Sequence, residues 1–153
     1  MKEGPHIIKL LDICYDQMSN TPALVFEHFS SLTLKHITNN ITVDKIKIVM
    51  FQLLEALAYS HAKGIMHRDV KPSNIILEPS TLEIKLIDWG LSEFYLEDAE
   101  YHTRVSSRPF KGPELLIGYK KYDFSMDIWS VGCILGGLIF EKNYFFIGKD
   151  NDD

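Results

Sequence analysis

The sequence HRDVKPSN, at residues 67–74, decides the fold of this chain together with DWG at residues 88–90. Within these stretches Asp69 can accept a proton from a hydroxyl group, and Lys71 follows two positions later. Asn74 and Asp88 add oxygen atoms of the hard type that Mg²⁺ prefers. A lone charged tripeptide is usually a solvated turn. Four chemically matched residues in this order instead indicate phosphoryl transfer.

The segments around these stretches predict two long helices and several short strands. Apolar residues at three- and four-residue intervals predict a helix that Thr42 caps and Gly64 ends. Ser125 is expected to cap a second helix, which is apolar on nearly all sides and therefore buried. Residues 31–38 predict a weak helical turn, and residues 98–113 a loop. The predicted strands are Ile7–Tyr15, Pro22–Glu27, Gly64–Met66, Asn74–Leu77 and Ile84–Ile87.

Further motifs stand on both sides of the central stretch. GPE occupies residues 112–114, and DIWSVG occupies residues 127–132. These motifs, in this order, resemble those of the protein kinases. Trp89, the segment LVFEH at residues 24–28 and the segment SRPFKGPELL at residues 107–116 resemble the catalytic α subunit of casein kinase II in particular.

The resemblance implies an α+β, protein kinase-like fold, mainly the helical large lobe with two strands of the small lobe and the hinge. Residues 1–27 would be a remnant of the small lobe and the start of the hinge. Residues 28–153 would be the large lobe, truncated after the buried central helix. About half of a standard kinase domain is then represented.

The resemblance also implies the activity, which is Ser/Thr protein kinase with ATP and Mg²⁺ as cofactors. Asp69, Lys71 and Asn74 would be catalytic, and Asn74 and Asp88 would hold the metal. The residues implied for nucleotide binding are Phe26 as gatekeeper, Glu27 and His28 as hinge, Ile76 and Ile87 as apolar floor and rear, and Asp88.

The substrates implied by the resemblance are Ser or Thr residues followed by acidic residues. Arg104, Arg108 and Lys111 match the basic positions that would receive these carboxylates, although basic residues are also common in exposed loops. A second implied partner is the regulatory β subunit of casein kinase II, for which Val25 and its neighbours offer part of a docking surface.

Several departures from the family pattern leave the activity of this chain open. The Gly-rich nucleotide loop and the lysine of the third strand are absent, and Pro109 replaces an aromatic residue. Glu114 lacks the arginine that pairs with it in the family, and apolar helix surface is expected to be exposed in a monomer. The alternative is therefore an inactive kinase-like fragment that acts at most as a binding module.

Other classes of site have less support. The six histidines show no tight metal spacing, and no Gly-x-Ser-x-Gly segment indicates a hydrolase. Aminoglycoside-type phosphotransferases share a His-x-Asp and Asn arrangement but do not usually carry the two downstream motifs.

The composition agrees with one globular domain. The chain has 153 residues, 46% of them hydrophobic, and a formal charge of −5, which argues against a general nucleic-acid binder. Cys14 and Cys133 lie in apolar runs and are expected to be reduced core thiols of a cytoplasmic or nuclear protein. The N-terminus has no apolar signal segment, and residues 128–140 are shorter than the ~20 residues that span a bilayer. No membrane association is therefore expected.

Overall fold

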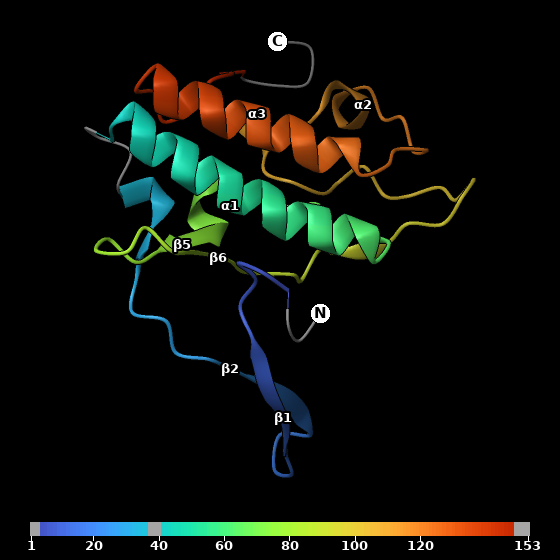
Figure 1. The fold of residues 1–153 in the computed structure, drawn as a ribbon. Helices are drawn as coiled ribbons and strands as arrows, with labels where there is room; N and C mark the ends of the chain where they lie inside the picture. Colours follow the sequence, from blue (N-terminus) through green and yellow to red (C-terminus); the bar gives the residue numbers. More distant parts are fainter. Residues whose placement is uncertain (1–3, 37–40, 149–153) are drawn as a thin grey trace.

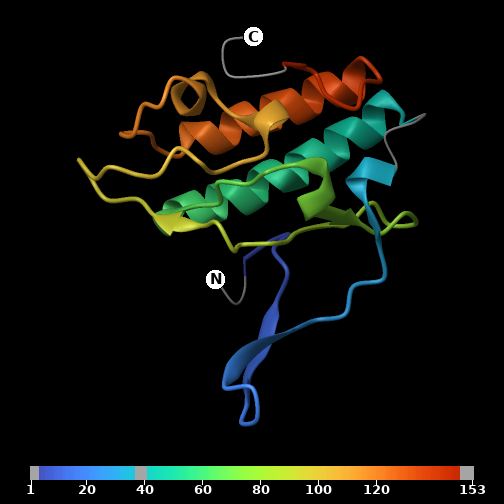
Figure 2. The same cartoon turned by 180° about the vertical axis from the view of Figure 1, so that it is seen from behind.

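Two long helices pack side by side over a small sheet, and a hairpin extends away on the other side of that sheet (Figures 1 and 2). The structure is a computed structural model that describes residues 4–36 and 41–148. The long helices are α1 (Val43–Ala62) and α3 (Ser125–Ile139), and α2 (Pro113–Leu116) is a single turn. The strands are β1 (Leu10–Asp16), β2 (Thr21–Phe26), β3 (Leu32–Thr33), β4 (Ile65–Met66), β5 (Ile75–Leu77), β6 (Ile84–Leu86) and β7 (Glu93–Phe94).

Helix α1 begins and ends where the sequence predicts. Thr42 Oγ1 accepts a hydrogen bond from Lys45 N at 3.5 Å, and Gly64 has a φ of +74°, in the left-handed region that favours glycine. The buried face of α1 carries Val49, Leu53 and six further residues. This face supplies much of the main hydrophobic core.

The sheet beneath α1 has the order β3-β5-β6, and all of its pairs are antiparallel. Gln52 connects the helix to this sheet, since its amide donates to Leu82 O at 2.7 Å and its oxygen accepts from Ile84 N at 3.1 Å. Beyond β6 the chain segment at Ile7 adds a parallel bridge to Leu86. The N-terminal segment is thereby attached to the main body next to the DWG stretch.

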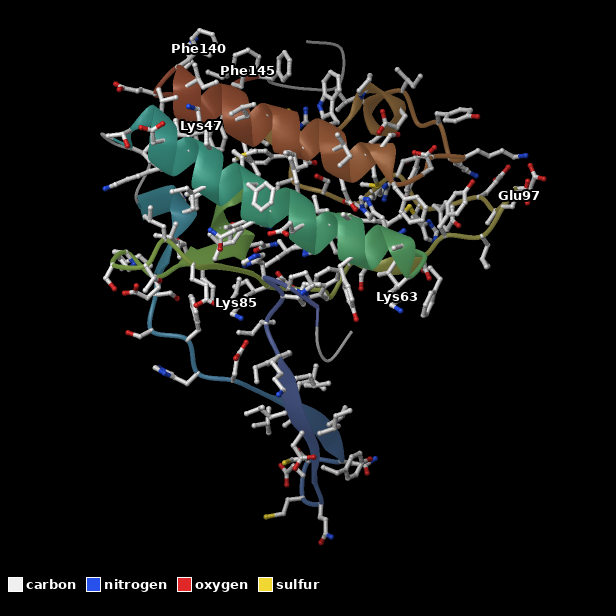
Figure 3. All side chains as sticks on the ribbon, viewed as in Figure 1. Lys47, Lys63, Lys85, Glu97, Phe140 and Phe145 are labelled. Atoms are coloured by element: carbon white, nitrogen blue, oxygen red, sulfur yellow. The ribbon has the colours of Figure 1, made fainter. Side chains whose placement is uncertain are left out.

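The predicted hairpin is present as β1 and β2, but it begins at Leu10 rather than Ile7. Most of its side chains stand away from the main body (Figure 3). Cys14 is consequently exposed, so the prediction of a core thiol at this position is wrong. Cys133 is buried as expected, and burial raises the pKa of its thiol to about 11.

Helix α3 corrects two further predictions. Its N-cap residue is Phe124, and Asp123 Oδ1 accepts the Ser125 N–H at 2.7 Å, so Asp123 rather than Ser125 provides the capping oxygen. The helix is also not buried on all sides, since Ile128 and Ile139 are 45% and 55% exposed. The described residues cover the faces that meet α1, the loop after β7 and the rings of Phe145 and Phe146, and the apolar side chains that stay exposed confirm the expected exposure of apolar helix surface.

The weaker local predictions are partly confirmed. A 3-10 turn at Leu34–His36 lies within the predicted helical turn, whose residues 37 and 38 lie outside the described part. The predicted loop at 98–113 contains one 3-10 turn, Arg108–Phe110. None of the helices in the described residues is long and apolar enough to cross a membrane.

Candidate functional site

The candidate active site centres on the carboxylate of Asp69, which is 5% exposed. Lys71 Nζ donates to Asp69 Oδ2 at 2.7 Å, and Asn74 Nδ2 donates to the same oxygen at 3.1 Å. Ser107 Oγ donates to Asp69 Oδ1 at 3.4 Å, and Lys71 Nζ also reaches Ser107 Oγ at 3.2 Å. Three residues of the central stretch and one distant hydroxyl therefore meet at one point.

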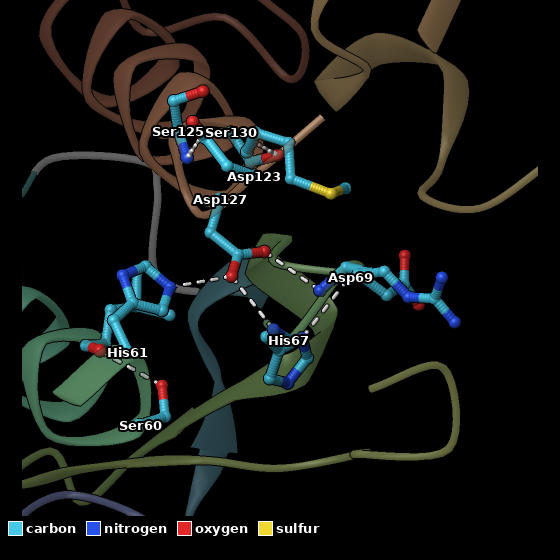
Figure 4. A network of polar contacts seen from close by, with 11 residues as sticks. Ser60, His61, His67, Asp69, Asp123, Ser125, Asp127 and Ser130 are labelled. Carbon is cyan, nitrogen blue, oxygen red and sulfur yellow. Dashed lines mark hydrogen bonds and ion pairs between the residues drawn. The ribbon is translucent and has the colours of Figure 1, made fainter. Parts of the chain in front are cut away.

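A buried carboxylate on α3 holds the loop that carries Asp69. Asp127 Oδ2 accepts the His67 N–H at 2.8 Å and contacts His61 Nε2 at 2.9 Å, while Oδ1 accepts the Arg68 N–H at 2.8 Å (Figure 4). The Asp127 side chain is almost fully buried. Charge-assisted hydrogen bonds in such an environment are strong and directional. The DIWSVG motif on α3 therefore fixes the backbone just before Asp69.

His67 is held in one tautomer by its two ring contacts. The Asp69 N–H donates to His67 Nδ1 at 3.2 Å, so Nδ1 is unprotonated, and Nε2 then donates to Ile87 O at 3.1 Å. Burial holds the pKa of His67 below its ordinary value of 6.5. Its ring also meets that of Trp89 edge-on, with centroids 4.5 Å apart. The neutral imidazole thus connects the Asp69 loop to the strand that precedes Asp88.

Arg68 fixes the segments that flank the site. Its Nε donates to Leu91 O at 2.6 Å and its NH1 to Tyr122 Oη at 3.1 Å, while Tyr122 in turn donates to His102 O at 2.6 Å. The Arg68 backbone has a φ of 66°, a left-handed conformation that costs a non-glycine residue roughly 1–2 kcal/mol. The hydrogen bonds of its amide and guanidinium groups offset this strain.

Asp88 lies next to Asn74 because the Ile87 N–H donates to Asn74 O at 2.9 Å. The amide nitrogen of Asn74 also donates to Asp69 O at 2.9 Å, which leaves the amide oxygen as the atom that can ligate a cation. The Asp88 carboxylate is exposed and makes no hydrogen bond within the described residues. Two hard oxygen donors side by side fit a cation that keeps several of its waters, as Mg²⁺ does.

No group of three or more His, Cys, Asp or Glu side chains suited to a metal occurs in residues 4–36 and 41–148. The described residues thus offer no separate structural metal site built from these side chains. A cation at Asn74 and Asp88 would need further ligands from water or from a bound phosphate.

A cavity of about 740 Å³ opens beside Asp88, between the hairpin and the main sheet. All the residues that the resemblance assigns to nucleotide binding line it. The Glu27 carboxylate accepts the Lys9 N–H at 2.9 Å and pairs with Lys85 at 3.7 Å, so it fixes the linker after β2 to the body. The lining residues are Ile7, Ile8, Leu10, Leu24, Phe26, Glu27, His28, Phe29, Ile76, Ile87, Asp88, Trp89 and Gly90.

The walls of this cavity are apolar on two opposite sides. Leu24 and Phe26 come from the hairpin, and Ile76 and Ile87 come from the main sheet and its end. A slot of this kind fits a flat, mostly apolar group such as a nucleobase. Asp88 lines the same cavity.

Three basic residues lie on the far side of Ser107. Arg104 and Arg108 are exposed and make no ion pair with the described residues, and Lys111 Nζ donates to Thr103 O at 3.2 Å. Burial, and to a smaller extent the charge of Arg108, lowers the pKa of Lys111. Neighbouring positive charges without a carboxylate partner favour binding of an anion.

Pro109 is accommodated without loss of a backbone hydrogen bond. It occupies the first turn of the 3-10 segment Arg108–Phe110, where an N–H has no partner within the turn. Ser130 Oγ donates to Phe110 O at 2.7 Å and anchors the end of this turn to α3. Glu114 makes no ion pair within the described residues.

The sequence did not assign a role to Ser107, although the structure places its hydroxyl against Asp69. In the sequence, Ser107 is only the first residue of the segment 107–116, which resembles casein kinase II. A serine has no distinctive spacing to Asp69, since 38 residues separate them. Only the fold brings the two together.

Comparison with known families agrees with this geometry. The protein kinase domain family matches residues 1–153, the whole length of the chain. The chain therefore belongs to the protein kinase family. Its mixed arrangement of helices and small antiparallel sheets fits a kinase-like fold.

Proposed function

We propose that this chain is a Ser/Thr protein kinase of the casein kinase II type, which transfers the γ-phosphoryl group of ATP to Ser or Thr in acidic protein segments. The observation that carries the proposal is the convergence of Lys71, Asn74 and Ser107 on the carboxylate of Asp69. In this proposal the described residues form the large lobe and part of the small lobe.

Asp69 has the position and the chemistry to orient an acceptor hydroxyl. The Ser107 hydroxyl already donates to its Oδ1, which shows that an alcohol can lie there. Lys71 Nζ lies next to the same point and would offset negative charge that develops on a phosphoryl group. The transfer needs mainly positioning and charge stabilisation, and these side chains supply both.

The cavity beside Asp88 supports the proposed binding of ATP and Mg²⁺. Leu24, Phe26, Ile76 and Ile87 provide an apolar lining for the base, and Asp88 lines the same cavity. Asn74 and Asp88 would hold the metal, which neutralises phosphate charge when bound.

The basic residues beyond Ser107 support an acidic substrate. Arg104 precedes Ser107 by three residues, and Arg108 and Lys111 follow it within four, so carboxylates next to the acceptor would meet uncompensated positive charge. The proposed partners are therefore acidic proteins rather than nucleic acids or membranes.

The test is phosphorylation of an acidic Ser peptide with ATP and Mg²⁺, measured for the wild type, Asp69→Asn and Asp98→Asn. Asp98 is a surface residue whose ion pair with Lys121 is exposed, so its substitution should leave the rate unchanged. We expect Asp69→Asn to lower the rate at least 100-fold. Equal rates for wild type and Asp69→Asn would refute catalysis by this chain.

The second candidate is a non-catalytic binding module. A specific observation favours it, because no lysine or arginine lines the 740 Å³ cavity among the described residues. The α- and β-phosphates would then lack a cationic partner in the cavity itself. A thermal melt separates the candidates: MgATP should raise the melting temperature if the chain binds nucleotide, and an unchanged value together with retained binding of acidic peptides would favour the module.

The regulatory β subunit of casein kinase II is a further proposed partner. Val25 and the other side chains of the hairpin are exposed and offer apolar contact area. We also propose a cytoplasmic and nuclear location, as for the protein type that the sequence resembles.

A further inference from the structure

A second cavity, of about 330 Å³, opens directly beside the Asp69 cluster. Two of the residues that line it, Lys71 and Ser107, are those whose side chains contact Asp69. The cavity therefore starts at the point where an acceptor hydroxyl would lie. Its other lining residues are Lys35, Pro72, Ser73, Pro109, Phe110, Asn143 and Tyr144.

Flat apolar groups form the walls of this cavity. Pro72 and Pro109 face it from the catalytic loop and the 3-10 turn, and Phe110 and Tyr144 supply two rings in edge contact, with centroids 6.2 Å apart. Prolines and aromatic rings are the partners on which another aromatic ring packs well. A volume of this size lies at the lower end of the range for ligand pockets and can hold one large side chain.

The polar groups around the cavity favour a neutral or electron-rich occupant. Tyr144 is 43% exposed, and neither its hydroxyl nor the Asn143 amide makes a hydrogen bond within the described residues. No carboxylate lines the cavity in this part of the chain, whereas Lys35 and Lys71 do. Lys71 is paired with Asp69 at 2.7 Å, so a basic side chain would find no free carboxylate in this lining and would lose hydration without gaining a partner.

Tyr144 also separates this cavity from the basic residues. A neighbouring hollow of about 380 Å³ shares Pro109 and Tyr144 with it and contains Arg108 and Lys111. Pro109 and Tyr144 thus form a wall with the Asp69 cluster on one side and the basic residues Arg108 and Lys111 on the other. A peptide bound at both would pass over Pro109 and Tyr144.

We propose that the 330 Å³ cavity is a substrate subsite that selects an aromatic side chain within two residues of the acceptor, with Tyr144 as the residue that determines this preference. The inference rests on the proposed function and narrows its substrate class. The sequence gives a reason for the subsite, because Pro109 stands where related kinases carry a larger aromatic residue. The smaller ring of proline leaves room that the Tyr144 ring borders from the other side.

The test measures peptide binding to the 153-residue chain by fluorescence anisotropy. The parent peptide carries one Ser with two Ala residues on each side of it, and four Glu residues follow the second pair of Ala residues. Each of these Ala residues is replaced in turn by Tyr or Arg, and a second series replaces Glu by Gln. We expect Tyr at one position to lower the Kd about tenfold, as burial of one aromatic side chain allows, and Arg there to raise it.

Variants of Tyr144 locate the effect. Tyr144→Phe should keep the preference for the aromatic peptide, whereas Tyr144→Ala and Tyr144→Leu should reduce the ratio of the two Kd values to below about three. The control is Tyr119→Ala, which removes an exposed tyrosine that lines none of these cavities and should keep the full ratio. Tyr144→Leu keeps more of the apolar contact with the Phe110 ring than Tyr144→Ala does. It therefore replaces Tyr144→Ala in the test if that variant unfolds.

The outcomes distinguish this inference from the function on which it rests. No gain from Tyr at any position, or a gain that survives in both Tyr144→Ala and Tyr144→Leu, overturns the subsite while binding of acidic peptides stands. A Tyr144-dependent gain, together with equal Kd values for the Glu and Gln parent peptides, supports the subsite and refutes the acidic substrate class. Failure of every peptide to bind refutes both.

Discussion

Asp127 is the residue whose charge holds the loop that carries Asp69, and replacement by asparagine tests this role. Asp127→Asn removes the charge from three hydrogen bonds and turns an amide N–H₂ toward donors. We expect a loss of about 3 kcal/mol in the free energy of unfolding, because breaking a buried, charge-assisted network leaves polar groups unpaired. Urea unfolding gives the measurement.

Asp98→Asn is the matched control for this substitution. The Asp98 carboxylate is exposed and pairs with Lys121 at 3.5 Å, so its loss should cost less than about 0.5 kcal/mol. Similar losses for the two variants would show that the Asp127 network contributes little to stability.

His67 makes the stability of the fold dependent on pH. Because its pKa is lowered by burial, the unfolded chain binds a proton more readily than the folded chain. The contribution of neutral His67 is therefore complete above its ordinary pKa of 6.5 and decreases as the pH falls below that value. We expect the free energy of unfolding to fall between pH 7 and pH 5, and to fall less steeply in His67→Gln.

The comparison for His67 uses a histidine at the surface. His102 is exposed, and its contact with Tyr122 uses the backbone carbonyl, so His102→Gln should keep the pH dependence of the wild type. Urea titrations at several pH values measure the slopes. A slope in His67→Gln as steep as that of the wild type would show that His67 does not cause the effect.

Individual residues differ in how far the sequence predicts them. Asp69, Lys71 and Asn74 lie within one short stretch, so their proximity follows from local spacing and the fold needs to add little. Ser107 and Cys14 were not predictable in the same way. The first is brought to Asp69 by a long loop, and the second lies in an apolar strand that the described residues leave uncovered.

Substitutions at two glycines test which backbone conformations the end of α1 and the interior of α3 require. Gly64 follows α1 at a φ of +74°, whereas Gly132 lies inside α3, and a Cβ at either position would meet no atom within 4 Å. Gly64→Ala should therefore lower the free energy of unfolding by about 1 kcal/mol through backbone strain alone. Gly132→Ala should raise it by a similar amount, because alanine favours the helix interior.

The two glycine variants control for each other, since both add one methyl group in open space. Thermal or urea unfolding measures the two changes in the same conditions. A stabilising Gly64→Ala would mean that α1 does not end in the left-handed conformation. A destabilising Gly132→Ala would indicate that another surface packs against that side of α3.

The helix ends show what local sequence can and cannot predict. Thr42 and Gly64 fix α1 because a hydroxyl cap and a left-handed glycine act within one turn. At α3 two polar residues, Asp123 and Ser125, compete for the cap, and the backbone angles of Phe124 decide which one serves. Short strands such as β4 and β7 depend on pairing across 27 or more residues, so β7 had no local signal strong enough to predict it.

The candidate site as a whole depends on contacts between distant segments. The 740 Å³ cavity takes walls from the hairpin, from β5 and from the end of β6, and the bridge between Ile7 and Leu86 attaches the N-terminal segment before the hairpin to β6. The sequence predicted which residues line the cavity through its resemblance to a family, because no local pattern relates Phe26 to Ile87. The basic residues beyond Ser107 were identified in the same way.

The exposed apolar faces of the two long helices give a prediction for the whole molecule. Phe51 on α1 and Ile139 on α3 are 63% and 55% exposed, in rows with other apolar side chains. Phe140 and Phe145 extend this surface beyond the end of α3, with ring centroids 5.6 Å apart (Figure 3). Contiguous apolar surface of this kind favours association, since water is excluded when two such faces meet.

We therefore expect the chain to self-associate at concentrations of about 10–100 µM, and Phe51→Glu with Ile139→Glu to reduce this association at least tenfold. Sedimentation velocity at a series of concentrations gives the measurement. Ile117→Glu is the matched control, because Ile117 is 80% exposed at the end of α2 and lies on neither long helix. If all variants and the wild type sediment as monomers throughout, the helix faces are too small to drive association. If Ile117→Glu dissociates the chain as effectively as the double variant, the interface lies near α2 instead.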